Sequence, residues 1–303
     1  MRRAVIDVGS NSVLLLISER KDSRWLPVRE TSRVTGLGTG VKTTGLIAPD
    51  AAQRTLRALR DAFELAWSEG VDHIVAAGTM ALRIAKNAGD FLARAESQGT
   101  PVQVLSGDEE AELGWRSVSD DPIFATSNPL TVIDVGGHST ELVNVAKSPD
   151  GWQVRYRTSH PVGTLGLRDQ RLANESPTAL DLLQAAAEID DLVGTCFLPG
   201  ACGTVVALGA SATNLVAIRD AMTEWDPAKV HGQFLTYEEI SRSVTWLSAM
   251  SDSERADLVG IEPGRETTIH LGALLLERFL FAARAEETRV SVRGWRHALL
   301  ESL

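Results

Sequence analysis

Two copies of one short motif carry the residues of this sequence that are best suited to chemistry. The stretch VIDVGSNSVLLLIS from Val5 aligns without gaps on VIDVGGHSTELVNV from Val132, and seven of the fourteen positions are identical. Each copy ends an apolar run with an aspartate, Asp7 or Asp134, and continues with a glycine-containing turn. An ionised carboxylate is costly in apolar surroundings unless it is paired or binds a cation. The two aspartates therefore predict a site for Mg2+ or Mn2+.

The turns themselves are suited to binding an anion, because backbone N–H groups in a tight turn form a cradle for phosphate. A single glycine-containing hairpin is more often structural than functional, but two matched copies favour function. The residues expected to contact phosphate are Ser10, Asn11, Gly136, Gly137, His138 and Ser139.

Other chemistries lack their motifs. The sequence has no Walker A pattern and no Gly-x-Gly-x-x-Gly run that opens a helix after a strand. Ser10 and Ser139 lie outside any nucleophile-elbow pattern, and the six histidines are not spaced for a catalytic triad. We expect these serines to donate hydrogen bonds to phosphate, with no covalent nucleophile.

The elements that must position these turns follow one plan twice. Each motif predicts two antiparallel strands joined by a tight turn. In the first half the expected elements then are a strand near 25–34, a helix over 49–69, the strand HIVAAGT, a helical stretch over 80–98 with a break at 87–89, and a helix starting in SGDEEAELGWRSV. In the second half they are a hairpin at 130–146, a strand at 151–158, helices near 164–172 and 178–193, the strand TVVALG, a helix from Ser211, and mainly helix after Thr236.

Strands followed by helices twice over predict an α/β protein with two domains. The paired hairpins resemble the actin-like, or ribonuclease H-like, architecture, in which duplicated domains face an interdomain cleft. The segment DDPIFATSNP, with two prolines and little periodicity, indicates the boundary. We expect an N-terminal domain over 1–124 and a C-terminal domain over 125–303.

The composition limits the classes of partner. The 303 residues are 44% apolar and carry a net charge of −10, which argues against sequence-independent binding to nucleic acid. A polyanionic substrate would need a local arginine cluster or a bound metal.

No signal peptide is visible, and charged residues interrupt the apolar stretch 269–283, so we expect a cytoplasmic protein that inserts in no membrane. That stretch could bury a domain interior or form the face of a homodimer. Cys196 and Cys202 are expected to be structural.

The order of motifs over nearly the whole chain resembles the exopolyphosphatase and guanosine pentaphosphate phosphohydrolase family, often called Ppx/GppA. The stretches that carry the resemblance are IDVGSNS (6–12), AAGTMALRIAKNAGDF (76–91), VQVLSGDEEAELGW (102–115), VIDVGGHSTELV (132–143), SERADLVGIEPGRETTIHLGALLLE (253–277) and RVSVRGWRHALL (289–300).

The resemblance implies roles for three residues. Glu110 aligns with the family's general base, Arg83 with an arginine that grips a phosphate, and Glu141 with a residue that positions metal or water. A planar guanidinium suits bidentate contact with phosphate. Each role has a structural alternative. Glu110 would stabilise the start of a helix, Arg83 would be an ordinary exposed arginine, and Glu141 would be an exposed strand residue. We expect the helix-start role for Asp108 or Glu109.

Three positions depart from the family pattern. His138 stands in a loop that usually reads Gly-Gly-Gly-Ser, Ala210 replaces a glycine before a helix, and His297 replaces a glutamate. The resemblance still implies an exopolyphosphatase that uses Mg2+ to release terminal phosphate, and the length of the chain favours short polyphosphates. The alternatives are a guanosine pentaphosphate phosphohydrolase, a regulator that binds guanosine tetraphosphate or polyphosphate without turnover, and, less favoured, an actin-like ATPase or sugar kinase.

Overall fold

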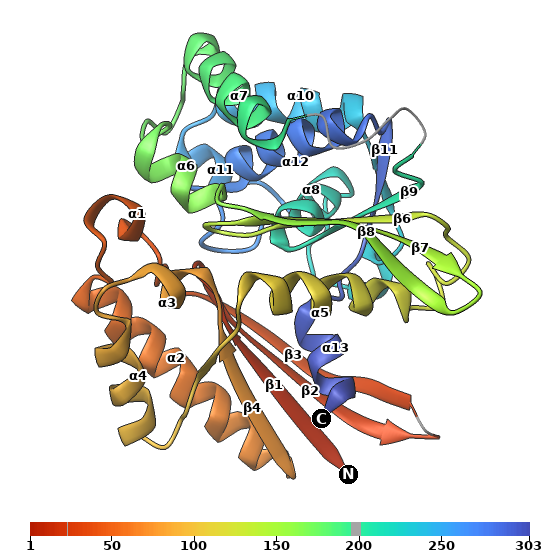
Figure 1. The fold of residues 1–303 in the computed structure, drawn as a ribbon. Helices are drawn as coiled ribbons and strands as arrows, with labels where there is room; N and C mark the ends of the chain where they lie inside the picture. The colour runs from red at the N-terminus through yellow and green to blue at the C-terminus, as the bar shows by residue number, and fades with distance from the viewer. Residues whose placement is uncertain (23, 195–200) are drawn as a thin grey trace. The chain divides into compact units, whose positions relative to one another are not determined.

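The computed structural model describes residues 1–22, 24–194 and 201–303, and the chain forms two compact units (Figure 1). The first unit contains residues 1–113 and 295–303, and the second contains residues 114–294. Two α/β domains were predicted and are found. The boundary differs, because it falls inside a helix at residue 113 and not in the proline-containing segment 120–129.

The first unit has a five-stranded sheet in the order β3-β2-β1-β4-β5 within the described residues. β2 pairs antiparallel with β1 and β3, whereas β4 is parallel to β1 and β5 is parallel to β4. The strands are β1 (Arg2–Val8), β2 (Ser12–Lys21), β3 (Arg24–Val34), β4 (His73–Gly78) and β5 (Gln103–Val104). The helices are α1 (Val41–Thr44), α2 (Pro49–Ser68), α3 (Met80–Ile84), α4 (Ala88–Ser97), α13 (Trp295–Ser302) and the first half of α5 (Gly107–Ser119).

Helices cover both faces of this sheet because its strands β1 and β2 are apolar on both sides. Ile6 and alternating residues of β1 and β2 pack with the apolar face of α2, which begins with Pro49 at its first turn as predicted. Val5 points to the opposite face, where it packs with Trp295 and Leu300 of α13. The carboxyl-terminal helix therefore belongs to the first unit, which the predicted division at 124 missed.

The second unit repeats the arrangement with a six-stranded sheet in the order β10-β11-β9-β6-β7-β8 within the described residues. Its strands are β6 (Leu130–Val135), β7 (Thr140–Ser148), β8 (Gly151–His160), β9 (Thr204–Leu208), β10 (Phe234–Thr236) and β11 (Glu287–Val290). Its helices are the second half of α5, α6 (Thr164–Gln170), α7 (Ala179–Val193), α8 (Ala210–Arg219), α9 (Pro227–Val230), α10 (Tyr237–Ser248), α11 (Asp252–Ala256) and α12 (Ile269–Ala283).

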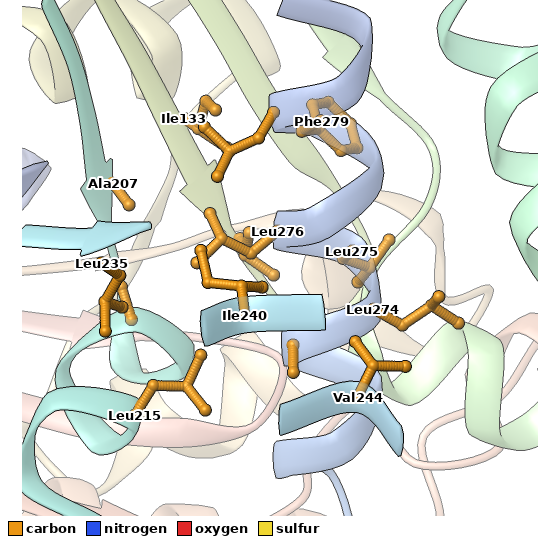
Figure 2. Packing of buried hydrophobic residues seen from close by; sticks show 14 of the residues in the cluster. Ile133, Ala207, Leu215, Leu235, Ile240, Val244, Leu274, Leu275, Leu276 and Phe279 are labelled. Carbon is orange, nitrogen blue, oxygen red and sulfur yellow. The ribbon is translucent and has the colours of Figure 1, made fainter. Parts of the chain in front are cut away.

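The core of the second unit forms around α12. Its leucines 274 to 276 and Phe279 are buried in one cluster with Ile133 of β6 and Ile240 of α10 (Figure 2). The apolar stretch 269–283 is thus a buried helix of the domain interior, the first of the two predicted alternatives. A homodimer stays a prediction. None of the helices formed by the described residues is long and apolar enough to span a bilayer.

The predicted duplication extends to a detail of the hairpins. The register between β2 and β3 shifts at Ile17/Ser18, and the register between β7 and β8 shifts at Asn144/Val145, which is the same place in the second copy of the motif. A bulge twists a strand and discourages pairing at a sheet edge. Both copies therefore share the bulge beside the outer strands β3 and β8.

Most predicted elements are confirmed with small shifts at their ends. The break in the helical stretch 80–98 lies between α3 and α4, and the region after Thr236 is mainly helical apart from β11. Cys202 is buried with a free thiol, as expected of a structural cysteine. The prediction for Cys196 lies outside the described residues.

Candidate functional site

The turn after β1 holds the first predicted phosphate-binding residues, and hydrogen bonds within the first unit fix its shape. The N–H of Gly9 donates to the carbonyl of Ser12 at 2.9 Å. The carbonyl of Asn11 accepts from the N–H groups of Thr35 and Gly36, and that of Ser10 accepts from Gly38. Among the hydrogen bonds of the described residues, none uses the backbone N–H of Ser10 or Asn11 as donor. This is the arrangement expected of an anion cradle.

A chain of contacts joins this turn to the two residues with predicted catalytic roles. The Ser10 hydroxyl accepts a hydrogen bond from the N–H of Ala81 at 3.2 Å, in the first turn of α3. Arg83, from the same helix, forms an ion pair with Glu110 of α5, with 2.9 Å between Nη1 and Oε2. The same guanidinium nitrogen donates to the carbonyl of Leu105 at 2.7 Å. The first unit thus brings Ser10, Arg83 and Glu110 into one linked region.

Glu110 is in surroundings that change its acidity. Its side chain is 11% exposed in the ion pair. Burial raises the pKa of the Glu110 carboxyl above its ordinary value, and the charge and hydrogen bond of Arg83 act in the opposite direction. A carboxylate with a raised pKa suits proton transfer near neutral pH.

Glu109 has the structural role expected for one of the carboxylates at this helix start. Its Oε2 accepts from the backbone N–H and the hydroxyl of Ser106, both at 2.8 Å, while the Ser106 hydroxyl accepts from the N–H of Glu109 at 3.2 Å. This reciprocal pattern is a capping box. The hydrogen bonds from Ser106 lower the pKa of Glu109. Two adjacent glutamates therefore differ, since one caps the helix and the other faces Arg83.

The turn after β6 holds the second set of predicted phosphate-binding residues. The N–H of Gly136 donates to the carbonyl of Ser139 at 3.0 Å, which repeats the bond between Gly9 and Ser12. The carbonyls of Gly136 and Gly137 accept from N–H groups at the start of α6. No hydrogen bond formed within 1–22, 24–194 and 201–303 uses the N–H of Gly137 or Ser139 as donor. The start of α6 thus holds this turn through its carbonyl groups and leaves these two N–H groups available for an anion.

His138 is almost fully buried in this turn, and its Nδ1 lies 3.1 Å from the carbonyl oxygen of Gly137. Gly163, the residue before α6, lies against the same backbone. A Cβ on Gly163 would come within 2.5 Å of the Gly137 carbonyl carbon and the His138 nitrogen. No pattern in the sequence identifies Gly163, because its partner is the backbone of a turn 26 positions earlier.

Asp134 and Glu141 are direct cross-strand neighbours in the pairing of β6 with β7. Directly opposed side chains lie on one face of a sheet with their Cβ atoms about 5 Å apart, and like charges there repel. Glu141 is buried and accepts a hydrogen bond from the Ser159 hydroxyl at 2.7 Å, which excludes the exposed-strand alternative. In the first copy, Asp7 faces Leu14 at the corresponding position, so only the second copy has paired carboxylates.

These carboxylates fit a hard divalent cation. Mg2+ is usually held by one or two carboxylates, with waters and substrate phosphates completing its shell. Gly209 follows β9 beside them with a φ of 84°, and its own Cβ, if present, would lie 3.1 Å from Asp134 Oδ1. The described residues contain no group of three His, Cys, Asp or Glu side chains placed to hold a metal. Asp7 belongs to the first unit, and its part in a metal site stays a prediction.

The other two departures from the family pattern have different surroundings. Ala210 opens α8 directly after Gly209. His297 is buried in α13 and lies, with Arg296, beside Glu30 of β3 in the first unit. Arg296 Nη2 is 2.7 Å from Glu30 Oε2. Burial alone would raise the pKa of Glu30, but the hydrogen bonds and charges of His297 and Arg296 lower it to about 2.

A fully buried arginine was also missed. Arg255, in the motif SERADLVG, has no exposed surface. Its guanidinium donates to Glu266 O, Leu247 O, Met250 O, Glu175 O and Asp252 Oδ1 at 2.6 to 2.9 Å. A buried guanidinium needs partners for its donors, and here backbone carbonyls supply most of them. The motif therefore has a structural role in the second unit.

Comparison with known proteins agrees with the motifs. The model of the Ppx/GppA phosphatase family matches residues 16–303. Exopolyphosphatase 2 of Mycobacterium tuberculosis is 30% identical over 290 residues, which cover 91% of this chain and 89% of the relative. The crystal structure of the Aquifex aeolicus Ppx/GppA family member is 30% identical and superposes with a TM-score of 0.80, covering 100% of this chain and 97% of that one. An exopolyphosphatase from Cytophaga hutchinsonii, 22% identical, shares the fold with a TM-score of 0.88 over 100% of this chain and 97% of its own. The resemblance drawn from the sequence is confirmed, and the chain belongs to the Ppx/GppA phosphatase family.

Proposed function

We propose that this protein is an exopolyphosphatase that releases terminal orthophosphate from inorganic polyphosphate by attack of water. The observation that carries the proposal is the pair of Arg83 and Glu110, linked through α3 to the turn that holds Ser10 and Asn11. Named exopolyphosphatases among the relatives support the substrate class. The reaction needs donors for phosphate oxygens and a carboxylate for water, and the chain has both.

In the proposed reaction, a water oxygen forms a bond to the terminal phosphorus while the bond from that phosphorus to the bridging oxygen breaks. Glu110 accepts a proton from the water, and the shortened polyphosphate leaves with the bridging oxygen. Arg83 and the N–H groups of Ser10 and Asn11 in the turn after β1 neutralise charge on the phosphate oxygens. The Ser10 hydroxyl donates a further hydrogen bond.

Asp134 and Glu141 are the residues that would hold Mg2+ or Mn2+, with Asp7 as a further candidate. When bound, the metal offsets negative charge that develops on the transferred phosphate. A hydrogen bond from the half-buried Ser159 keeps Glu141 oriented on its strand. This assignment rests on the direct pairing of two carboxylates.

The test compares phosphate release by the parent, Glu110→Gln and Glu109→Gln, with Mg2+, from tripolyphosphate, long-chain polyphosphate and guanosine pentaphosphate. We expect Glu110→Gln to lose at least about 100-fold in kcat, as for removal of a general base. Glu109→Gln should retain most activity, because Glu109 caps a helix. Equal losses in both variants would contradict the assignment.

The substrate panel separates the alternatives. Release from guanosine pentaphosphate at the higher kcat/KM would make that nucleotide the substrate of the same site. A preference for tripolyphosphate over long chains would support the expected use of short polyphosphates. His138, buried in the second turn, is the observation that keeps a binding protein as the second candidate. Binding of polyphosphate or guanosine tetraphosphate without any release by the parent would favour that candidate.

A further inference from the structure

Two long segments of the first unit contain no carboxylate, although the chain is acidic overall. Residues 31–49 and 73–89 contain no Asp or Glu, in a chain with a net charge of −10. The two segments lie side by side. The Ile47 N–H donates to the Asn87 side chain at 2.8 Å, the Asn87 amide donates to the Ile47 carbonyl at 3.0 Å, and the Lys86 N–H donates to the Gly45 carbonyl at 2.9 Å.

This region is directly joined to the first turn. Thr35 and Gly36 donate their N–H groups to the Asn11 carbonyl, both at 2.9 Å, and Gly38 donates to Ser10 at 2.7 Å. The glycine-containing connection 36–45 therefore continues from the residues proposed to bind the terminal phosphate. An extended substrate that leaves the turn on this side would lie along the connection.

Two exposed cations border the connection. The Arg54 side chain, from α2, donates through Nε to the Thr35 carbonyl at 3.2 Å, and a Cβ on Gly36 would lie 3.9 Å from its Nη2. Lys86 lies at the other end, where a Cβ on Gly45 would be 3.7 Å from its Nζ. Neither cation forms an ion pair with a carboxylate of the described residues, although Asp50 and Asp90 are near in sequence. Their charges are therefore not neutralised by a neighbour.

Asn11 of the turn and Thr35, whose carbonyl accepts from Arg54, both have a buried polar side chain. Thr35 Oγ1 and Asn11 Nδ2 have no hydrogen-bond partner among the described residues, and both residues are at least nine-tenths buried. Leaving such a group without a partner costs about 1 to 3 kcal/mol. A hydroxyl and an amide can both donate to phosphate oxygens. The Asn11 amide and the Thr35 hydroxyl therefore supply hydrogen-bond donors from the turn towards Arg54.

We propose that Thr35, Arg54 and Lys86 form a polyphosphate track, which binds the phosphate groups that follow the terminal one. The inference rests on the proposed function for its substrate. Polyphosphate carries a negative charge on every unit, so it gains from donors and from cations that form no ion pair within the described residues. Since exposed ion pairs are individually weak, the track should act through several contacts and respond to salt.

The test uses Arg54→Gln/Lys86→Gln and a matched control, Arg20→Gln/Arg24→Gln. The control removes the same charge from exposed residues at the far end of the β2–β3 hairpin. We expect the track variant to raise KM for long-chain polyphosphate about tenfold with kcat within about twofold, and to change KM for tripolyphosphate much less. Its KM should also rise less steeply with salt than that of the parent. Equal KM values for the track variant and the control would overturn the inference.

Thr35→Val supplies an independent variant. It removes an unpaired buried hydroxyl, so its melting temperature should equal or exceed that of the parent, whereas its affinity for polyphosphate should fall about fivefold. Unchanged affinity would remove Thr35 from the track.

Equilibrium binding separates this inference from the proposed function. The dissociation constant of end-labelled polyphosphate is measured by fluorescence anisotropy for the parent, the track variant and the control. If the parent releases no phosphate, the exopolyphosphatase proposal fails, yet about tenfold weaker binding by the track variant alone still supports the track. If the parent is active and all three proteins bind equally, the track fails and the proposed function stands.

Discussion

Arg83 Nη1 lies 2.9 Å from Glu110 Oε2, so the arginine expected to grip phosphate is paired with the carboxylate expected to activate water. Burial raises the pKa of Glu110, and Arg83 limits that rise. A base must be ionised to accept a proton. The guanidinium therefore opposes the effect of burial on the pKa of Glu110, and we expect its remaining donors to bind substrate.

The pH dependence of activity tests this pairing. Activity should rise with pH through the pKa of Glu110, which lies above its ordinary value of 4.5. In Arg83→Gln the opposing charge is lost, so the acid limb of the kcat/KM profile should move to higher pH, in addition to a lower maximum. Arg83→Lys keeps the charge and should shift the limb less. The measurement is phosphate release between about pH 5 and 9.

Arg94→Gln is the control, because Arg94 is an exposed arginine of the same unit. Its profile should match that of the parent. An acid limb that stays in place in Arg83→Gln would show that Arg83 does not govern the ionisation of Glu110.

The cross-strand pair of Asp134 and Glu141 leads to a prediction about metal that does not depend on turnover. Mg2+ should raise the melting temperature of the parent, because it binds the folded state and relieves repulsion between the carboxylates. Asp134→Asn and Glu141→Gln should each lose most of this rise, and without metal each should be at least as stable as the parent, because removal of one charge also relieves the repulsion. The measurement is a thermal unfolding series in Mg2+ and in Mn2+.

Asp150→Asn changes an exposed aspartate at the tip of the β7–β8 hairpin and should leave the Mg2+ effect intact. A metal-dependent rise that survives in both Asp134→Asn and Glu141→Gln would place the cation elsewhere.

The repeat shows how far the sequence alone could lead. Both hairpins, both turns and the carboxylates at the strand ends follow from alternation and from the match between the two copies. The buried state of Glu141 could not be read from its strand, because it depends on β8 and the Ser159 hydroxyl. Likewise, the resemblance distinguishes Glu110 from its neighbour Glu109, but the ion pair of Glu110 with Arg83, 27 positions earlier, could not be read from the sequence.

Contacts between distant segments account for the rest. α13 joins the first unit because Trp295 and Leu300 pack with Val5, at the opposite end of the sequence. His297, which replaces a glutamate of the family pattern, lies beside the carboxylate of Glu30. No local pattern identifies a partner more than 260 positions away.

Glu30 predicts a pH-dependent contribution to stability. Its pKa is lowered from 4.5 to about 2 in the folded protein, so the folded state favours the ionised form. The contribution is fully present above about pH 4.5 and is lost as the pH falls towards about 2. Glu30→Gln should therefore have a lower melting temperature than the parent at pH 7, and this gap in melting temperature should narrow at pH 3.

Glu64→Gln changes an exposed residue of α2 and should show no such gap. A gap that is constant with pH would contradict the ion-pair explanation.

Gly163 gives a prediction in which the turn after β6 is disturbed without a change of charge. Its φ is −158°, which any residue adopts, so the constraint is steric and not conformational. The Cβ of Gly163→Ala would approach the Gly137 and His138 backbone to 2.5 Å, and the turn must move to accommodate it. We expect a loss of about 1 to 3 kcal/mol in unfolding free energy, as for other overpacked sites, and at least about tenfold in kcat/KM.

Gly89→Ala is the matched control, since a Cβ at that helical position meets nothing within 4 Å and alanine favours helix. The two variants are compared by denaturant unfolding and phosphate release. Parent-like kcat/KM in Gly163→Ala would show that the shape of the second turn is not needed for catalysis.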